Sequence, residues 1–280
     1  MKIISDPRKM TSFALSAWKK GLKIGFVPTM GALHEGHLEL VRSAKRTSDI
    51  TVVSIFVNPI QFGPKEDFKK YPRNIKKDVR LLKREKVDVL FCPAAGKMFP
   101  EGFSSYVEVS GLDKNLCGAS RPGHFRGVAT VVAKLFNIVR PDTAFFGAKD
   151  FQQQAIIKKL VKDLDMGIRI VTVKTAREKD GLAKSSRNVY LSKGHREQAT
   201  VLYKALSLAA KMIRSGEKNA AKVTAAVKKT ILKGADFRTD YISIVDPETL
   251  EYQKTIKRPT LIAVAAYLGK TRLIDNILVA

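Results

Sequence analysis

Two of the four histidines in this 280-residue chain lie three residues apart in a short glycine-rich segment. They are His34 and His37, within PTMGALHEGHLELV at 28–41. Residues three apart share one face of a helical turn, so both imidazoles are expected on the same side. An imidazole donates hydrogen bonds to phosphate oxygens, and its protonated form neutralises developing negative charge. The pair is therefore a candidate for phosphate chemistry.

The residues around the two histidines predict a phosphate-binding turn. An apolar strand precedes the segment and a helical pattern follows it, while Gly31 and Gly36 allow tight turns and close approach of the backbone to a ligand. A helix N-terminus offers unpaired N–H groups and a positive dipole, which favour an anion. Two alternatives are structural histidines and a zinc site, for which no third Cys or His lies nearby in the sequence.

A second candidate for nucleotide binding is FFGAKDFQQ at 145–153. It places Gly147, Lys149 and Asp150 where a strand passes into a helix. Glycine lets the backbone approach a nucleotide, lysine supplies a positive charge, and aspartate can hold ribose hydroxyls or a metal-bound water. The same pattern is also common in turns without any ligand.

A third polar segment, KSSRN at 184–188, combines serine hydroxyls with a guanidinium group. These groups can grip phosphates, and arginine can stabilise the charge on a departing pyrophosphate. By itself the segment is equally typical of a phosphorylation loop or a disordered hinge.

Three isolated polar residues complete the candidates. Gln61 follows Asn58–Pro59 at the expected end of a strand, and its amide suits substrate hydroxyls, although a polar loop residue is the alternative. Arg121, in RPGHFRG, is a candidate anion contact or part of a structural turn. Asp78 is a candidate Mg²⁺-linked carboxylate, although we expect it to be a surface acid on a basic helix face.

The elements that must position these residues alternate between strand and helix in the first half of the chain. Strands are predicted at 24–29, 51–57, 87–92, 106–111, 143–147 and 168–173. Helices are predicted at 37–47, 74–85, 128–139 and 151–164. This alternation of apolar, β-branched strands with helices predicts an α/β fold: a Rossmann-like, doubly wound parallel sheet covered on both faces.

The pattern changes after residue 176. Two helices, at 196–216 and 220–234, precede strands at 240–245, 260–268 and 272–279. We therefore predict a Rossmann-like ligand-binding domain at 1–176 and a smaller C-terminal α+β lid domain at 177–280, joined through the polar stretch 177–188. Such folds place ligands at the carboxyl ends of parallel strands, here in a cleft between the domains.

The charge of the chain is unusual, with 51 Lys and Arg against 26 Asp and Glu and a net charge of +25. Such a charge suits a nucleic-acid-binding protein, but the cations are spread along the chain and no nucleic-acid-binding motif accompanies them. The densest run, 69–86, predicts an amphipathic helix with Ile75, Val79, Leu82 and Val87 on its apolar face. A solvated basic face is thus the favoured interpretation.

The cysteine content indicates a reducing compartment, and the hydropathy pattern indicates a protein that does not cross a membrane. The two cysteines, Cys92 and Cys117, lack CxxC spacing, so we interpret them as small apolar residues, with a disulfide or a metal pair as alternatives. The sequence contains no signal-peptide pattern, and its longest apolar runs have only the length of strands. We expect a cytoplasmic protein without membrane contact.

The motifs also resemble those of a known family. HEGH after an apolar strand resembles the HxGH signature of the nucleotidylyltransferase superfamily, which class I aminoacyl-tRNA synthetases share, and PTMGALHEGHLELV resembles the pantothenate synthetase family. Segments 56–73, 121–153 and 177–192 resemble its substrate-binding loop, its most distinctive block and its flexible lid, which corresponds to the KMSKS loop of related enzymes. The similarity covers most of 25–192 in the family's order.

This resemblance implies an ATP-dependent ligase that joins pantoate to β-alanine through a pantoyl adenylate, uses Mg²⁺ and forms a homodimer. Nucleic acid is not an expected partner. It implies catalytic roles for His34, His37, Lys149 and Arg187. It also implies Gln61 as a contact of pantoate and β-alanine, and Gln153 as a contact of pantoate. The implied ATP contacts are Met30, Gly31, Ala32, Leu33, His34, Glu35, Gly36, His37, Gly147, Ala148, Lys149, Asp150, Ala176, Lys184, Ser185, Ser186 and Arg187.

Two positions depart from the family pattern. Lys184 stands where the family more often has Met, and Ala148 stands where it often has Glu. Neither change removes an expected catalytic group. An adenylyl- or nucleotidyltransferase with the same HxGH core but another substrate remains an alternative, although it does not account for the block at 121–153.

Overall fold

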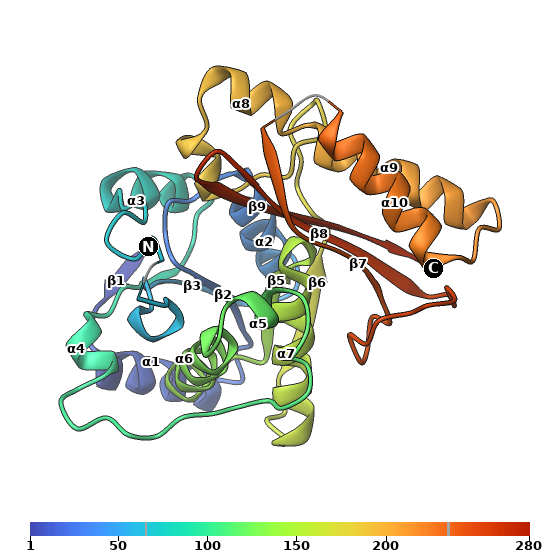
Figure 1. Cartoon of the computed structure of the whole chain (residues 1–280). Coiled ribbons are helices and arrows are strands. Elements are labelled where there is room, and N and C mark those ends of the chain that lie inside the picture. The colour runs from blue at the N-terminus through green and yellow to red at the C-terminus, as the bar shows by residue number, and fades with distance from the viewer. Residues whose placement is uncertain (65, 234–235) are drawn as a thin grey trace. The chain divides into compact units, whose positions relative to one another are not determined.

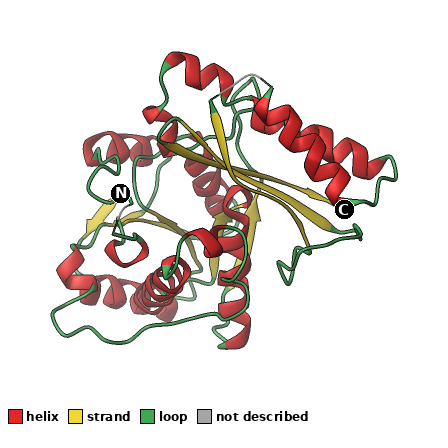
Figure 2. Cartoon of the chain, in the orientation of Figure 1, coloured by secondary structure: helices red, strands yellow, loops and turns green. Residues whose placement is uncertain are grey.

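The computed structural model describes residues 1–64, 66–233 and 236–280, drawn in Figures 1 and 2. The chain divides into two compact units. The first contains Met1–Val109, Arg121–Ala148 and Ile156–Lys174, and the second contains Ser110–Ser120, Lys149–Ala155 and Thr175–Ala280. The second unit thus takes two short segments from before residue 156 as well as the C-terminal part. The single domain boundary at 176/177 stays a prediction.

The first unit is built on a six-stranded parallel sheet with the order β1-β4-β3-β2-β5-β6. Its strands are β1 (Lys2–Ile4), β2 (Ile24–Thr29), β3 (Ile50–Ile55), β4 (Val89–Phe91), β5 (Thr143–Gly147) and β6 (Arg169–Val173). From β2 the chain proceeds through β3 to β4 on one side and then returns to β5 and β6 on the other. The predicted doubly wound sheet is confirmed.

Helices cover both faces of this sheet. They are α1 (Pro7–Lys19), α2 (Glu35–Lys45), α3 (Ile75–Arg84), α4 (Ala95–Met98), α6 (His124–Val139) and α7 (Phe151–Asp163), the last of which begins in the second unit. Val27 and Phe145 belong to the core cluster that contains Val41 of α2, whereas Phe26 and Phe146 each meet Phe136 of α6 edge-on. Successive side chains of a strand point to opposite faces, so both faces are buried.

The N-terminal elements β1 and α1 were not predicted from the sequence. Their signals are present: Asp6 accepts hydrogen bonds from the N–H groups of Arg8 and Lys9, and Pro7 occupies the first helical position. Met10, Ala14 and Ala17 then form a buried stripe at helical spacing. A three-residue strand such as β1 is too short to stand out in a hydropathy pattern.

The predicted strand at 106–111 is wrong. The segment is irregular, and Val107 and Val109 pack against Ala129, Ala133 and Leu160. The N–H of Val107 donates to Oγ1 of Thr130 on α6 rather than to another strand. The alternating pattern arose because one side of an extended segment lies on helices.

The second unit contains an antiparallel sheet with the order β7-β8-β9. Its elements are β7 (Phe237–Val245), β8 (Thr260–Leu268) and β9 (Thr271–Val279), with α5 (Cys117–Ser120), α8 (Lys193–Gln198), α9 (Val201–Arg214) and α10 (Ala220–Leu232). Buried residues of α9, α10 and the three strands form one core cluster. The helix predicted at 196–216 is two helices, and residue 234 of the other lies outside the described residues.

No helix in the described part of the chain combines the length and the apolar character that crossing a membrane requires.

Candidate active site

The candidate residues of the first unit follow three neighbouring strands. β2 pairs with β3 on one side and with β5 on the other. Residues 30–37 follow β2, the 3₁₀ helix η1 (Pro59–Gln61) follows β3, and Gly147 ends β5. The chain reverses its direction of travel across the sheet between β2 and β5. Ligands of open α/β sheets bind at the carboxyl ends of strands where this switch occurs.

His34 and His37 form the first turn of α2. His34 is the N-cap: its Nδ1 accepts from the N–H of Gly36 at 3.1 Å. The N–H of His34 in turn donates to Nδ1 of His37 at 3.3 Å. The ring centroids are 4.0 Å apart, so the predicted shared face is confirmed. Because both Nδ1 atoms accept, each neutral ring carries its proton on Nε2 and can donate from that atom.

Asp78 accepts hydrogen bonds from the backbone of the turn before α2. Its side chain on α3 is almost fully buried, with 1% of the residue exposed. Oδ2 accepts from the N–H of Ala32 at 2.9 Å, and Oδ1 accepts from the N–H of Leu33 at 2.8 Å. The expectation of a surface acid is therefore wrong. Asp78 lies four residues before the buried Leu82 on the inner face of α3, a spacing visible in the sequence.

The backbone of this turn has a shape that fits an anion. Gly31 and Ala32 have φ values of +81° and +50°, and a Cβ on Gly31 would lie 3.1 Å from Oδ2 of Asp78. Successive N–H groups in such a turn form a concave anion site, which here holds a carboxylate of the chain itself. Burial raises the pKa of Asp78, and the bonds from Leu33 and Ala32 act against that rise.

The N–H groups expected to be unpaired at this turn have acceptors within the chain. The N–H of Gly31 donates to Oγ1 of Thr29, in addition to the four amides of Ala32, Leu33, His34 and Gly36 already described. The prediction of a cradle of unpaired amides is thus wrong for these five groups. The imidazoles of His34 and His37 can each donate to a phosphate oxygen from Nε2.

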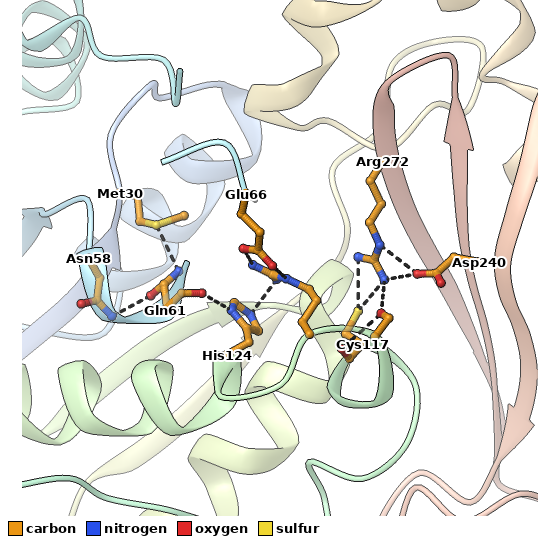
Figure 3. Close-up of polar contacts among 10 residues, drawn as sticks. Met30, Asn58, Gln61, Glu66, Cys117, His124, Asp240 and Arg272 are labelled. Carbon is orange, nitrogen blue, oxygen red and sulfur yellow. Dashed lines mark hydrogen bonds and ion pairs between the residues drawn. The ribbon is translucent and has the colours of Figure 1, made fainter. Parts of the chain in front are cut away.

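Gln61 lies in a buried polar cluster at the end of β3 (Figure 3). Its Oε1 accepts from Nδ2 of Asn58 at 3.0 Å, and its Nε2 lies 3.2 Å from Sδ of Met30. Asn58 also donates to the carbonyl of Gly127 on α6 at 3.0 Å, while its own Oδ1 is buried and has no hydrogen-bond partner among the residues that the structure describes. The cluster connects Gln61 with the turn that carries the histidines.

The segment RPGHFRG holds η1 in place. Nδ1 of His124 lies 2.8 Å from the carbonyl oxygen of Gln61, and Nε2 lies 2.8 Å from a terminal nitrogen of Arg121. Arg121 also forms a two-point ion pair with Glu66, at 2.7 and 2.6 Å (Figure 3). These contacts support the structural interpretation of Arg121 over the anion contact. Sequence reasoning missed Glu66 and the role of His124.

In the second unit, Lys149 is the main cation of η2 (Ala148–Asp150). Its side chain is 17% exposed and lies 3.7 Å from Oδ1 of Asp150. Nδ2 of Asn276 on β9 donates to the carbonyl of Lys149 at 2.8 Å, which fixes the backbone at this point. Asn276 had no signal in the sequence, because β9 is distant along the chain.

The glutamines at the start of α7 divide into two roles. Gln152 is buried, accepts from the N–H of Cys117 and donates to the carbonyls of Leu112 and Asn115. It is therefore a structural anchor. Gln153, the predicted pantoate contact, is half-buried.

The predicted lid segment begins with a hydrogen-bonded turn. The N–H of Lys184 donates to the carbonyl of Ala176, and Arg177 pairs with Ala183 across the turn. Arg177 forms a two-point ion pair with Asp275 at 2.6 and 2.9 Å and stacks over the ring of Tyr203 at 4.0 Å. These residues give the segment a defined shape rather than that of a disordered hinge.

The phosphate-binding candidates follow that turn. Lys184 pairs with Glu178 at 2.9 Å, so the charge added at this position is balanced within the segment. Oγ of Ser185 accepts from the N–H of Arg187 and caps η3 (Ser186–Tyr190). Ser186 and Arg187 thus occupy the first turn of a short helix.

Both cysteines are free. Cys117 does more than fill space, because its Sγ lies 3.2 Å from the phenol oxygen of Tyr241 and 3.5 Å from a terminal nitrogen of Arg272. Arg272 also pairs with Asp240 at 2.7 Å (Figure 3). Burial, and then the neighbouring Cys117, raise the pKa of Tyr241 well above 10.0.

The structure brings together Met30, His34, His37 and Gln61 in the first unit, with Gly147 and Ala148 at the end of the adjacent β5. Lys149, Asp150, Gln153, Ala176 and the segment 184–187 belong to the second unit. In the described ranges no three His, Cys, Asp or Glu side chains are grouped to hold a metal ion. Asp78 does not fit a Mg²⁺ ligand, because both of its oxygens accept backbone N–H groups.

The doubly wound parallel sheet places the chain in the α/β class, and the HxGH turn after β2 resembles that of the nucleotidylyltransferases. Within that class the assignment is specific. A family model described as pantoate-beta-alanine ligase matches residues 2–278. The chain belongs to this family and is a ligase.

Individual relatives match this chain over nearly their full lengths. The chain is 52% identical to a pantothenate synthetase of Caldicellulosiruptor bescii over 279 residues, covering 100% of this chain and 99% of the relative. A pantothenate synthetase structure from Thermus thermophilus has a TM-score of 0.93 and 44% identity, with 99% of each chain covered. A pantoate-beta-alanine ligase from Francisella tularensis, complexed with beta-gamma ATP and beta-alanine, has a TM-score of 0.82 and 37% identity, covering 99% of this chain and 97% of that one.

Proposed function

We propose that this chain catalyses the ATP-dependent condensation of (R)-pantoate with β-alanine to pantothenate, through a pantoyl-adenylate intermediate. The observation that carries the proposal is the family match from residue 2 to residue 278. The HxGH turn and the polar cluster at Gln61 supply the local chemistry that such a reaction needs.

The reaction has two steps. A carboxylate oxygen of pantoate attacks the α-phosphorus of Mg·ATP, the bond to the bridging oxygen of the β-phosphate breaks, and pyrophosphate leaves. The amine of β-alanine then attacks the acyl carbon, AMP leaves, and the amine loses a proton. Neither step requires a covalent bond to the enzyme, so catalysis depends on positioning and on stabilisation of charge.

We assign the first step to the donors and cations of the predicted site. Nε2 of His34 and His37 donate to phosphate oxygens, a role that the Nδ1 contacts at the start of α2 support. Lys149, Ser185, Ser186 and Arg187 bind the triphosphate and stabilise the departing pyrophosphate. The remaining ATP contacts are those of residues 30–37, Gly147, Ala148, Asp150, Ala176 and Lys184.

Gln61 and Gln153 select the substrates in this proposal. An amide both donates and accepts hydrogen bonds, so it can bind the hydroxyl and carboxylate groups of pantoate. Gln61 also contacts β-alanine in this proposal. Mg²⁺ enters as part of the nucleotide substrate, since this ion is commonly bound through phosphates with few protein ligands. The segment 180–188 closes as a lid that excludes water from the mixed anhydride.

Two properties of the whole protein belong to the same proposal. We place the enzyme in the cytoplasm, where ATP is available and two free thiols remain reduced. We also propose a homodimer, whose mass sedimentation velocity measures directly.

The test follows the two steps separately. The enzyme with Mg·ATP and D-pantoate alone should release pyrophosphate, and the addition of β-alanine should then yield AMP and pantothenate. Pyrophosphate release that ignores pantoate, while ATP still binds, would contradict the substrate assignment and favour an adenylyltransferase for another acid.

A further inference from the structure

We infer that His124 is a positioning residue for the ligase reaction, because it fixes the backbone of Gln61 and thereby the amide that meets the substrates. The inference deepens the proposed function and rests on it. His124, with Arg121 and Glu66 behind it, lies outside the residues assigned to substrate contact. We call His124, Arg121 and Glu66 the Gln61 support.

The contacts of His124 define the state of its ring. Arginine only donates, so Nε2 of His124 must accept the bond from Arg121 at 2.8 Å. The ring proton is therefore on Nδ1, which donates to the carbonyl oxygen of Gln61 at 2.8 Å. His124 is buried, with 8% of the residue exposed. The Gln61 support thus holds a neutral imidazole in a single tautomer.

Glu66 fixes the other end of the support. Its two oxygens accept from Nε and a terminal nitrogen of Arg121, at 2.7 and 2.6 Å, which leaves the other terminal nitrogen directed at His124. The Arg121 and Glu66 side chains are only 18% and 25% exposed. Two parallel bonds fix the plane of a guanidinium group, so the direction of the third bond is fixed with it.

The backbone of Gln61 requires such support because η1 is a single turn of three residues, Pro59–Gln61. Short 3₁₀ helices have poor internal hydrogen-bond geometry. Here α6 supplies the missing contacts: a Cβ on Gly127 would collide with the carbonyl of Ile60, and Gly127 accepts from Asn58. His124 forms the bond to the peptide carbonyl of Gln61 itself. Rotation of that peptide would move the side-chain amide from its place beside Met30.

A matched pair of substitutions separates this role from simple packing. The amide nitrogen of asparagine can occupy the place of Nδ1, so His124→Asn keeps the donor to Gln61. Glutamine reaches the place of Nε2, so His124→Gln keeps a partner for Arg121 and loses the donor to Gln61. We expect His124→Gln to raise KM for pantoate and β-alanine about tenfold, as for the loss of one buried hydrogen bond. KM for ATP should change by less than about twofold.

We expect His124→Asn to keep KM for pantoate and KM for β-alanine within about threefold of the wild-type values. Arg126→Lys, at an exposed arginine of the same segment that stacks over Tyr106, is the control and should leave all three KM values unchanged. Equal KM values for the Asn and Gln variants, or a rise in KM for all three substrates, would overturn the inference. Wild-type enzyme inactive with pantoate would instead contradict the proposed function.

A second variant serves if His124→Gln does not fold, as judged by its thermal melt. Glu66→Gln removes the charge that orients Arg121 and leaves His124 intact. It should raise KM for pantoate and β-alanine in the same direction but by a smaller factor. A folded Glu66→Gln enzyme with unchanged KM values would count against the Gln61 support.

Discussion

His34 and His37 illustrate how one side chain can serve structure and chemistry through different atoms. Nδ1 of each ring accepts a backbone N–H and caps α2, whereas Nε2 carries the proton of the neutral ring. The structural and functional interpretations of these histidines are therefore compatible. A substitution can be chosen that removes one role and keeps the other.

His37→Asn keeps an acceptor near the place of Nδ1 and lacks the Nε2 donor. We expect a melting temperature close to that of the wild type and a rate of pantoyl-adenylate formation lower by about 10²–10³-fold, as for the loss of one donor to a developing charge. Single-turnover release of pyrophosphate and a thermal melt measure the two effects. An unchanged rate in a folded variant would show that His37 caps α2 and does not contribute to adenylate formation.

At the scale of elements, Asp78 joins α3 to the turn between β2 and α2. The bond to Ala32 spans 46 residues of sequence and the bond to Leu33 spans 45. The side chain of Asp78 therefore supplies acceptors on α3 for two backbone N–H groups of the turn that precedes α2. The turn depends on α3 for its shape.

Asp78→Asn tests this dependence. Asparagine offers one oxygen where two N–H groups need acceptors, so one buried donor is left without a partner. We expect a loss of about 1–3 kcal/mol in the free energy of unfolding and weaker ATP binding. Asp88→Asn is the matched control, because the carboxylate of the exposed Asp88 accepts the backbone N–H of Thr51 through one oxygen, Oδ2, and the side-chain oxygen of asparagine can still accept it. Equal stability of the two variants would show that the turn does not need the carboxylate.

At the scale of the whole molecule, Tyr241 links stability to alkaline pH. Burial raises its pKa well above the ordinary value of 10.0. A raised folded-state pKa gives stability that is present below about pH 10 and is lost as the pH rises toward the folded-state value.

Tyr241→Phe should be less stable than the wild type by about 1 kcal/mol near neutral pH, because it lacks the hydroxyl that meets Cys117. Above about pH 10 the difference should narrow, since only the wild type loses the contribution of the phenol. Denaturant unfolding of both proteins across this range measures the difference. A constant difference at all pH values would contradict the linkage.

Local signals in the sequence predicted most of the architecture, including the strand, turn and helix that carry His34 and His37. They failed where packing between distant segments decides structure. The segment with Val107 has the alternating pattern of a strand because one of its sides packs on helices. Asp78 was predicted to be a surface acid because the sequence does not show that it accepts the N–H groups of Ala32 and Leu33. The bond from His124 to Gln61 spans 63 residues, and no pattern within either segment indicates it.

The contact of Asp78 with the turn at Gly31 and Ala32 has a consequence for the thermodynamics of nucleotide binding. The chain carries its own anion beneath that turn, so the backbone is already ordered before a nucleotide arrives. Ordering a loop on binding consumes part of the interaction energy, and a preorganised loop avoids that loss. The entropic cost of ordering the site around ATP therefore arises in other parts of the site. The turn at Gly31 and Ala32 keeps the same backbone conformation before and after ATP binds.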